Sequence, residues 1–99
     1  MTIEMKRNGT ELTLAIEGQM DSANSPRADE AVKDHINGIT RLVFDLEKVN
    51  YMTSAGLRVL VAAQKTMDRQ GEMVILHANE AVRDVFAMVG LLDIFTVLP

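Results

Sequence analysis

The chain has 99 residues, 47% of them apolar and 24% charged, which is typical of a globular protein and excludes a largely disordered one. Ten basic and 14 acidic side chains give a net charge of −4, so we expect no nucleic-acid binding and no direct membrane binding. Without cysteine there can be no disulfide, thiol catalysis or cysteine metal site. No signal-peptide or membrane-spanning pattern is visible, so we expect one cytoplasmic domain over residues 1–99.

The N-terminal part of the chain predicts an antiparallel hairpin. Apolar and polar residues alternate over residues 3–7 and 11–17, on either side of Asn8-Gly9, a favoured hairpin turn. Residues 18–24 are polar and predict a turn.

A helix is expected next. Ser25 would be its N-cap, Pro26 its first residue and Gly38 its end. Apolar and neutral side chains recur at helical spacing and predict a stripe that faces the core: Ala28, Val32, His35, Ile36 and Ile39.

The central part predicts a buried strand over residues 42–46, a polar loop over 47–50, and a helix over 55–70 that ends at Gly71. The expected core face of this helix is Gly56, Val59, Leu60, Ala63 and Met67, with Arg58, Lys65 and Arg69 opposite. Val61 and Ala62 border the polar face, where apolar residues suggest a contact surface.

The C-terminal part predicts a strand over residues 73–76 and a last strand over 94–97. Between them, Asn79 would cap a helix that ends at Gly90 and buries Val82, Val85, Phe86 and Val89. Because helices follow strands, we expect an α/β domain with a mixed four- to five-stranded sheet and helices packed mainly on one face.

Ser54 is the candidate functional residue, because its hydroxyl lies where a strand passes into an apolar helix. The N–H groups and the positive dipole end of such a helix favour an anion, so a phosphate on Ser54 would be well accommodated. The structural alternative is that Ser54 only caps the helix.

Three segments carry a family resemblance: Asp45-Leu46-x-x-Val49-x-Tyr51-Met52-Thr53-Ser54-Ala55-Gly56-Leu57, Glu17-Gly18-x-x-Asp21 and Val89-Gly90-Leu91-x-x-Ile94-Phe95. Together they resemble STAS domains, in particular bacterial anti-sigma-factor antagonists. The resemblance implies that a partner, an anti-sigma factor that is also a serine kinase with a histidine-kinase-like ATPase domain, phosphorylates Ser54. Many antagonists have aspartate before this serine, whereas this chain has Thr53, a second possible acceptor.

A surface around Ser54 is expected to bind the partner. Arg58 is one helical turn further on and could reach a phosphate or a partner carboxylate, or simply be solvated. Asp21 and Asp45 end predicted strands and either flank the serine or stabilise turns. Met20 and Met52 fall in predicted loops and could face a partner. The predicted partner-binding residues are Asp21, Ser22, Asn24, Met52, Thr53, Ala55, Gly56, Arg58 and Val61.

Neither histidine suggests a metal site. His35 is on a core stripe and His77 follows a strand, and neither has a companion at metal-ligand spacing, so we expect no metal and no cofactor.

The resemblance implies a non-enzymatic antagonist, monomeric when free, that binds the kinase until Ser54 is phosphorylated and is reset by a serine phosphatase. One alternative is a STAS subunit that is not phosphorylated and docks on a membrane transport ATPase complex. Another is a hydrolase with Ser54 as nucleophile, although the sequence offers only half of a nucleophile elbow and no evident base.

Overall fold

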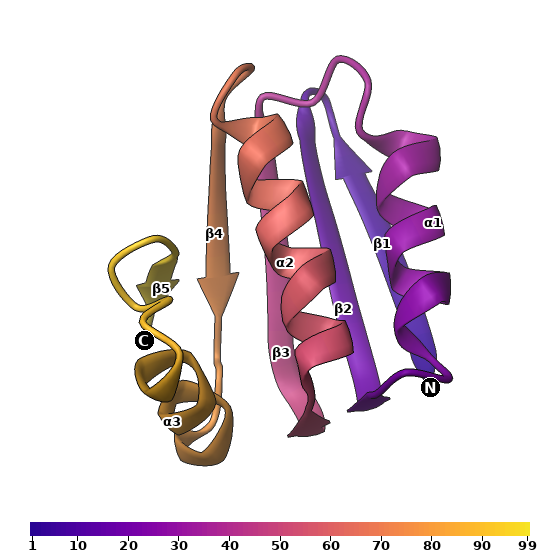
Figure 1. The fold of residues 1–99 in the computed structure, drawn as a ribbon. Helices are drawn as coiled ribbons and strands as arrows, with labels where there is room; N and C mark the ends of the chain where they lie inside the picture. Colours follow the sequence, from indigo (N-terminus) through magenta and orange to yellow (C-terminus); the bar gives the residue numbers. More distant parts are fainter.

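The protein is a five-stranded sheet with three helices, as a computed structural model of residues 1–99 shows (Figure 1). The strands follow one another across the sheet in chain order, with β1 antiparallel to β2 and all other pairs parallel. The elements are β1 (Thr2–Asn8), β2 (Glu11–Met20), α1 (Ser25–His35), β3 (Arg41–Met52), α2 (Ser54–Met67), β4 (Glu72–Leu76), α3 (Glu80–Met88) and β5 (Thr96–Leu98).

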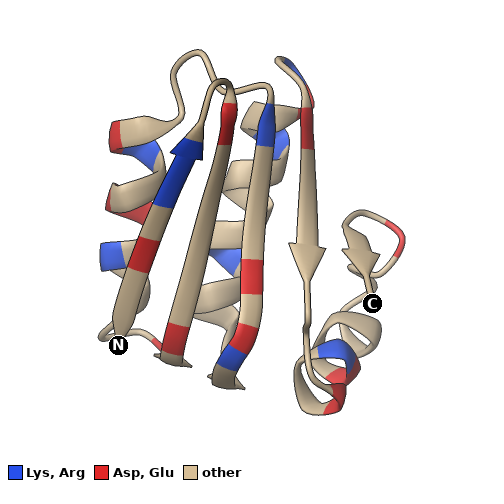
Figure 2. Cartoon of the chain, turned by 180° about the vertical axis from the view of Figure 1, so that it is seen from behind, with Lys and Arg blue, Asp and Glu red and all other residues tan.

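The helices are unequally placed around the sheet. α1 and α2 lie side by side against one face, and α3 lies past the end of β4, where it contacts β3 (Figure 1). Seen from the other side, no helix covers β1, β2 or β3 (Figure 2). The predicted α/β class, the mixed sheet and the packing of helices mainly on one face are confirmed.

The alternating pattern of the strands places one continuous core under α1 and α2. In β2, Leu12, Leu14 and Ile16 are all at most 1% exposed. They are next to Leu42 and Phe44 of β3, which are fully buried in the same cluster. This burial of apolar surface is the main stabilising contribution to the fold.

The strands around the serine are longer than predicted. β2 continues to Met20 and β3 to Met52, through the residues predicted as a turn and a loop. The two strands stay paired because register shifts after Ala15 and after Gly18 re-establish pairing, as β-bulges do. Met20 and Met52 are therefore core residues, 0% and 6% exposed, and the prediction that they lie in loops and face a partner was wrong.

Several helix predictions also need correction. Asn24, not Ser25, is the N-cap of α1, so Ser25 is its first residue and Pro26 its second. His35 is exposed, and its Nδ1 lies 2.9 Å from the Ala31 carbonyl oxygen rather than in the core. Val89 follows the end of α3 and is 52% exposed.

The limits of two further elements shift as well. α2 ends at Met67, three residues before the predicted end, and the Gly71 N–H donates to the Met67 carbonyl at 2.7 Å. A Cβ on Gly71 would lie 1.9 Å from the Thr40 carbonyl oxygen, so glycine is required there. β5 begins at Thr96, two residues later than predicted.

Candidate functional site

Ser54 is the first residue of α2 and follows directly from the end of β3. The last paired residues of β2 and β3 are Met20 and Met52, so Ser54 lies just beyond the C-terminal ends of these two central strands. Its side chain is exposed, and its hydroxyl makes no hydrogen bond to the protein. The N-cap position belongs to Thr53, so the structural alternative that Ser54 caps the helix was wrong.

Thr53 ties this junction to β2. Its N–H and its hydroxyl both donate to the Met20 carbonyl oxygen, at 3.1 and 2.9 Å. Its side chain makes no capping hydrogen bond to the first turn of α2. The first N–H groups of a helix have no acceptor within the helix, and no side chain supplies one here. The start of α2 therefore presents free donors and a positive dipole end.

Gly56 allows α2 to approach the sheet closely. A Cβ at this position would lie 2.6 Å from the Met52 Sδ, 2.7 Å from the Met20 Cβ and 2.8 Å from the Met20 carbonyl oxygen. Any larger residue would push the first turn of α2 outward. The glycine that follows Ser54 by two residues is thus a packing requirement, and being buried it has little surface to offer a partner.

The loop after β2 lies beside the serine. One carboxylate oxygen of Asp21 accepts from the N–H groups of Ala23 and Asn24, at 3.1 and 2.9 Å. This turn leaves Asn24 half-buried and Ser22 exposed, on a groove that Ala55 and Arg58 of α2 also line. Asp21 thus lies near Ser54, as predicted, and also stabilises a turn.

Asp45 does not lie near the serine, and the prediction that it flanks Ser54 was wrong. It is in the middle of β3, where it pairs with Ala15 on one side and Leu76 on the other. The error follows from the length of β3, which continues seven residues beyond Asp45.

A groove of about 440 Å³ runs between α1 and α2 beside Ser54. Arg58 and Ala55 line it from α2, and Ser25, Asp29 and Lys33 line it from α1. Asp29 accepts from the Lys33 ammonium at 2.8 Å, and this hydrogen bond, with the negative charge of Asp29, raises the pKa of Lys33 above its ordinary value. Sequence reasoning found Arg58 but missed the α1 residues, because nothing in the spacing shows which helix faces would meet.

The two apolar residues beside the polar face of α2, Val61 and Ala62, have different surroundings. Val61 packs partly against the core, whereas Ala62 is exposed and lines the groove. Ala62 is therefore the residue that meets the expectation of an apolar contact position.

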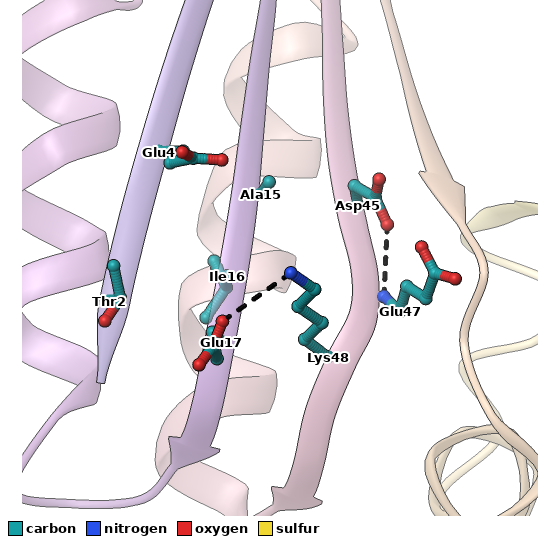
Figure 3. A pocket seen from close by; sticks show the side chains of 8 residues that line it. All are labelled: Thr2, Glu4, Ala15, Ile16, Glu17, Asp45, Glu47 and Lys48. Atoms are coloured by element: carbon teal, nitrogen blue, oxygen red, sulfur yellow. Dashed lines mark hydrogen bonds and ion pairs between the residues drawn. The ribbon is translucent and has the colours of Figure 1, made fainter.

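A second hollow, of about 290 Å³, lies on the open face of the sheet (Figure 3). Some of its charged groups have partners: Lys48 lies 3.8 Å from a Glu17 carboxylate oxygen, and Asp45 accepts from the Glu47 N–H at 3.1 Å. The carboxylates of Glu4 and Glu47 have none. On the same face Arg41 bridges Glu11 and Glu72. The one hydroxyl of this hollow, that of Thr2, lies in β1 and not at the start of a helix, so it lacks the free N–H groups that lie beside Ser54.

His77 has companions that its sequence position did not reveal. Its Nδ1 lies 3.1 Å from an Asp45 carboxylate oxygen, and together with Glu47 the three residues bring ligand-type atoms within 4.8 Å of one another. Its neighbours come from β3, which runs beside β4. The prediction that His77 has no companion was wrong, although exposed groups of this kind are common without an ion.

The geometry around Ser54 does not resemble a hydrolase site. His35 contacts the Ala31 carbonyl and His77 contacts Asp45, so neither is positioned to take a proton from the Ser54 hydroxyl. None of the three helices is long and apolar enough to cross a membrane.

Comparison with known proteins gives a consistent result. The model of the STAS domain family matches residues 2–99. BtrV of Bordetella bronchiseptica, a candidate anti-sigma factor antagonist, is 34% identical over 98% of this chain and 85% of its own length. The anti-sigma-B factor antagonist of Listeria monocytogenes is 33% identical over 98% of this chain and 88% of its own.

Solved structures share the fold. An anti-sigma factor antagonist from Mycobacterium paratuberculosis superposes with a TM-score of 0.90 at 21% identity, over 99% of this chain and 85% of that one. The Bacillus cell-fate determinant SpoIIAA in its phosphorylated form has a TM-score of 0.78 at 15% identity, over 99% and 92%.

Proposed function

Because the chain belongs to the STAS domain family, among the anti-sigma-factor antagonists, we propose that it is an antagonist switched by phosphorylation of Ser54. Unphosphorylated, it binds an anti-sigma factor that is also a serine kinase of the histidine-kinase-like ATPase class. Phosphorylated, it is released, and a serine phosphatase resets it. It acts in the cytoplasm, is a monomer when free, and is a regulator rather than an enzyme.

The observation that carries the proposal is the free Ser54 hydroxyl on the exposed first turn of α2. Thr53 is half-buried and its hydroxyl is hydrogen-bonded to Met20, which makes Ser54 the better acceptor of the two. In the transfer, a new bond forms between the Ser54 Oγ and the γ-phosphorus of ATP. The bond to the β-phosphate oxygen breaks, ADP leaves, and the hydroxyl proton passes to a base of the kinase, which also binds the ATP.

The phosphate costs the isolated fold much less free energy than it costs the complex. On the isolated chain it meets free N–H groups and the helix dipole, so it costs the fold little, on the order of 1 kcal/mol or less. In a closed interface the same dianion loses its solvation, which costs a few kcal/mol. The proposed partner surface comprises Asp21, Ser22, Asn24, Thr53, Ala55 and Arg58, together with Ser54, whereas Met52 and Gly56 support it from below.

Phosphotransfer with purified proteins tests the proposal. Each histidine-kinase-like ATPase of the source organism would be incubated with radiolabelled ATP and with the wild type, Ser54→Ala or Thr96→Ala. The last variant is a control, since it removes an exposed hydroxyl from β5, outside the proposed partner surface. We expect one kinase to label the wild type and Thr96→Ala but not Ser54→Ala. Ser54→Asp should bind that kinase on the order of a hundredfold more weakly than Ser54→Ala.

Two results would change the assignment. Labelling of Ser54→Ala would move the acceptor to Thr53. If no kinase labels the wild type, the switch is wrong, and docking on a transport ATPase without phosphorylation replaces it.

A further inference from the structure

Arg58 has no partner in the protein. Its guanidinium makes no ion pair and no hydrogen bond, and among the other arginines only Arg69 is also without one. Arg7, Arg27 and Arg83 each donate to a backbone carbonyl, and Arg41 pairs with two carboxylates. Arg58 is exposed on the wall of the groove between α1 and α2. The groove therefore contains a cation whose charge is not neutralised.

The groove is a positive site on an acidic molecule. Two cations and one carboxylate line it, Lys33 and Arg58 against Asp29, which gives +1, while the whole chain carries −4. Lys33 is already paired with Asp29, so Arg58 supplies the free charge. Neither α1 nor α2 has an acidic residue in its first turn, and so the positive ends of both dipoles add to the field.

The wall of the groove also contains a buried hydroxyl without a partner. Ser25 is 2% exposed, and its Oγ has no hydrogen-bond partner in the protein. Leaving a buried polar group unsatisfied is costly, and native proteins rarely do so without a reason. The Ser25 Oγ has almost no accessible surface, so a rotation of the side chain toward the groove would let an acceptor that enters from outside satisfy this hydroxyl.

We propose that the groove between α1 and α2 binds an acidic side chain of the partner kinase, which pairs with Arg58 and accepts a hydrogen bond from Ser25. A carboxylate suits this site because it can accept two hydrogen bonds from a guanidinium and a third from a hydroxyl. A protein partner is the occupant, since the site adjoins Ser54, which a kinase must reach. The inference rests on the proposed function.

This docking site gives the switch a mechanism in this chain. Ser54 and Arg58 are four residues apart on α2, a spacing that places side chains next to each other on a helix. A phosphate on Ser54 is then the nearest strong acceptor for the guanidinium and takes it from the partner's carboxylate. The partner loses its counter-ion at the moment when the phosphate adds a negative charge.

The affinity of the kinase that labels Ser54, measured calorimetrically without ATP, tests the docking site. We expect Arg58→Ala to weaken binding about tenfold and Arg58→Glu at least about a hundredfold, because the second variant also repels the carboxylate. Ala62→Leu, which fills the groove without changing charge, should weaken it about tenfold. Lys65→Glu, a matched charge reversal at an exposed position of the same helix, should change it less than about threefold.

The outcomes separate the two proposals. If the kinase labels Ser54 but binds Arg58→Glu as tightly as Lys65→Glu, the groove proposal fails and the phosphorylation switch stands. If no kinase labels the wild type, the proposed function fails and the docking site with it.

The competition for Arg58 has a test of its own that needs no partner. Phosphoserine can be incorporated at position 54 during translation, and its second pKa, ordinarily about 6, followed by ³¹P NMR. Pairing with Arg58 should lower this pKa by about 0.5 relative to the Arg58→Ala protein, with the Lys65→Ala protein as control. Equal values in all three proteins would overturn the competition.

Discussion

The two exposed regions of the molecule differ in how many of their polar groups are paired. On the open face of the sheet most charges have a partner: Arg41 bridges Glu11 and Glu72, and Lys48 lies near Glu17. At the end where β2 and β3 stop, the Ser54 hydroxyl, Arg58 and the first N–H groups of α2 have no partners in the protein. Polar groups that a fold leaves unpaired are available to a ligand, and this end of the molecule gathers them.

The difference extends to the backbone beneath each region. The open face rests on the pairing of whole strands, with two register shifts between β2 and β3, whereas the serine end depends on a few special contacts, Thr53 with Met20 and Gly56 against Met20 and Met52. A small number of contacts therefore positions the Ser54 hydroxyl, Arg58 and the free N–H groups of α2. Variants at the serine end and on the open face test this comparison.

Gly56→Ala should have the largest effect. Its Cβ would meet backbone and core atoms at 2.6 to 2.8 Å, and overpacking of this kind outweighs the better helix propensity of alanine. We expect the free energy of unfolding to fall by about 2 kcal/mol in urea denaturation.

Gly38→Ala is the control for Gly56→Ala. Gly38 has a φ of 81° but nothing within 4 Å of a Cβ, so its substitution should cost only about 1 kcal/mol, through backbone strain. A Gly56→Ala protein as stable as the wild type would mean that the first turn of α2 is not held closely against β2.

Thr53→Val should have an intermediate effect. It keeps the shape of the side chain but removes the hydroxyl that donates to the Met20 carbonyl, so we expect a loss of about 1 kcal/mol. Thr53→Ser retains the donor and should stay within about 0.5 kcal/mol of the wild type. Equal stabilities of the two variants in the same denaturation experiment would show that this hydrogen bond does not hold the junction.

Arg41→Ala on the open face should have the smallest effect. Its side chain is 37% exposed and its partners more so, and pairs at this exposure are screened by solvent. We expect a loss below about 1 kcal/mol that shrinks further in 1 M NaCl. A larger loss that salt does not reduce would show that the paired charges of this face stabilise the fold in their own right.

Local patterns in the sequence predicted much of this architecture. The alternation of Leu12, Leu14 and Ile16 predicted a half-buried strand, and Asn79 was correctly expected as the cap of α3, where its side chain accepts from the Val82 N–H. Ser54 was correctly expected at a strand-to-helix junction. In these cases neighbours along the chain decide the conformation.

Predictions failed where a residue's environment comes from distant parts of the chain. Residues 47–50 look like a loop because they are mostly polar, but β2 continues to pair with Lys48 and Val49 and keeps the segment in β3. His35 fits a core stripe by spacing, yet it remains exposed. His77 and Asp45, 32 residues apart, meet only because β3 and β4 are neighbours.

By itself, the sequence determined the class of fold, the position of Ser54 at the start of a helix and the family resemblance, because each depends on residues close together in the chain. Only the tertiary structure decided that α1 and α2 form a groove, that Ser25 is buried there without a partner, and that Arg58 is left free. These properties depend on which surfaces meet when the helices pack on the sheet. That packing is set by the summed burial of the core and not by any local motif.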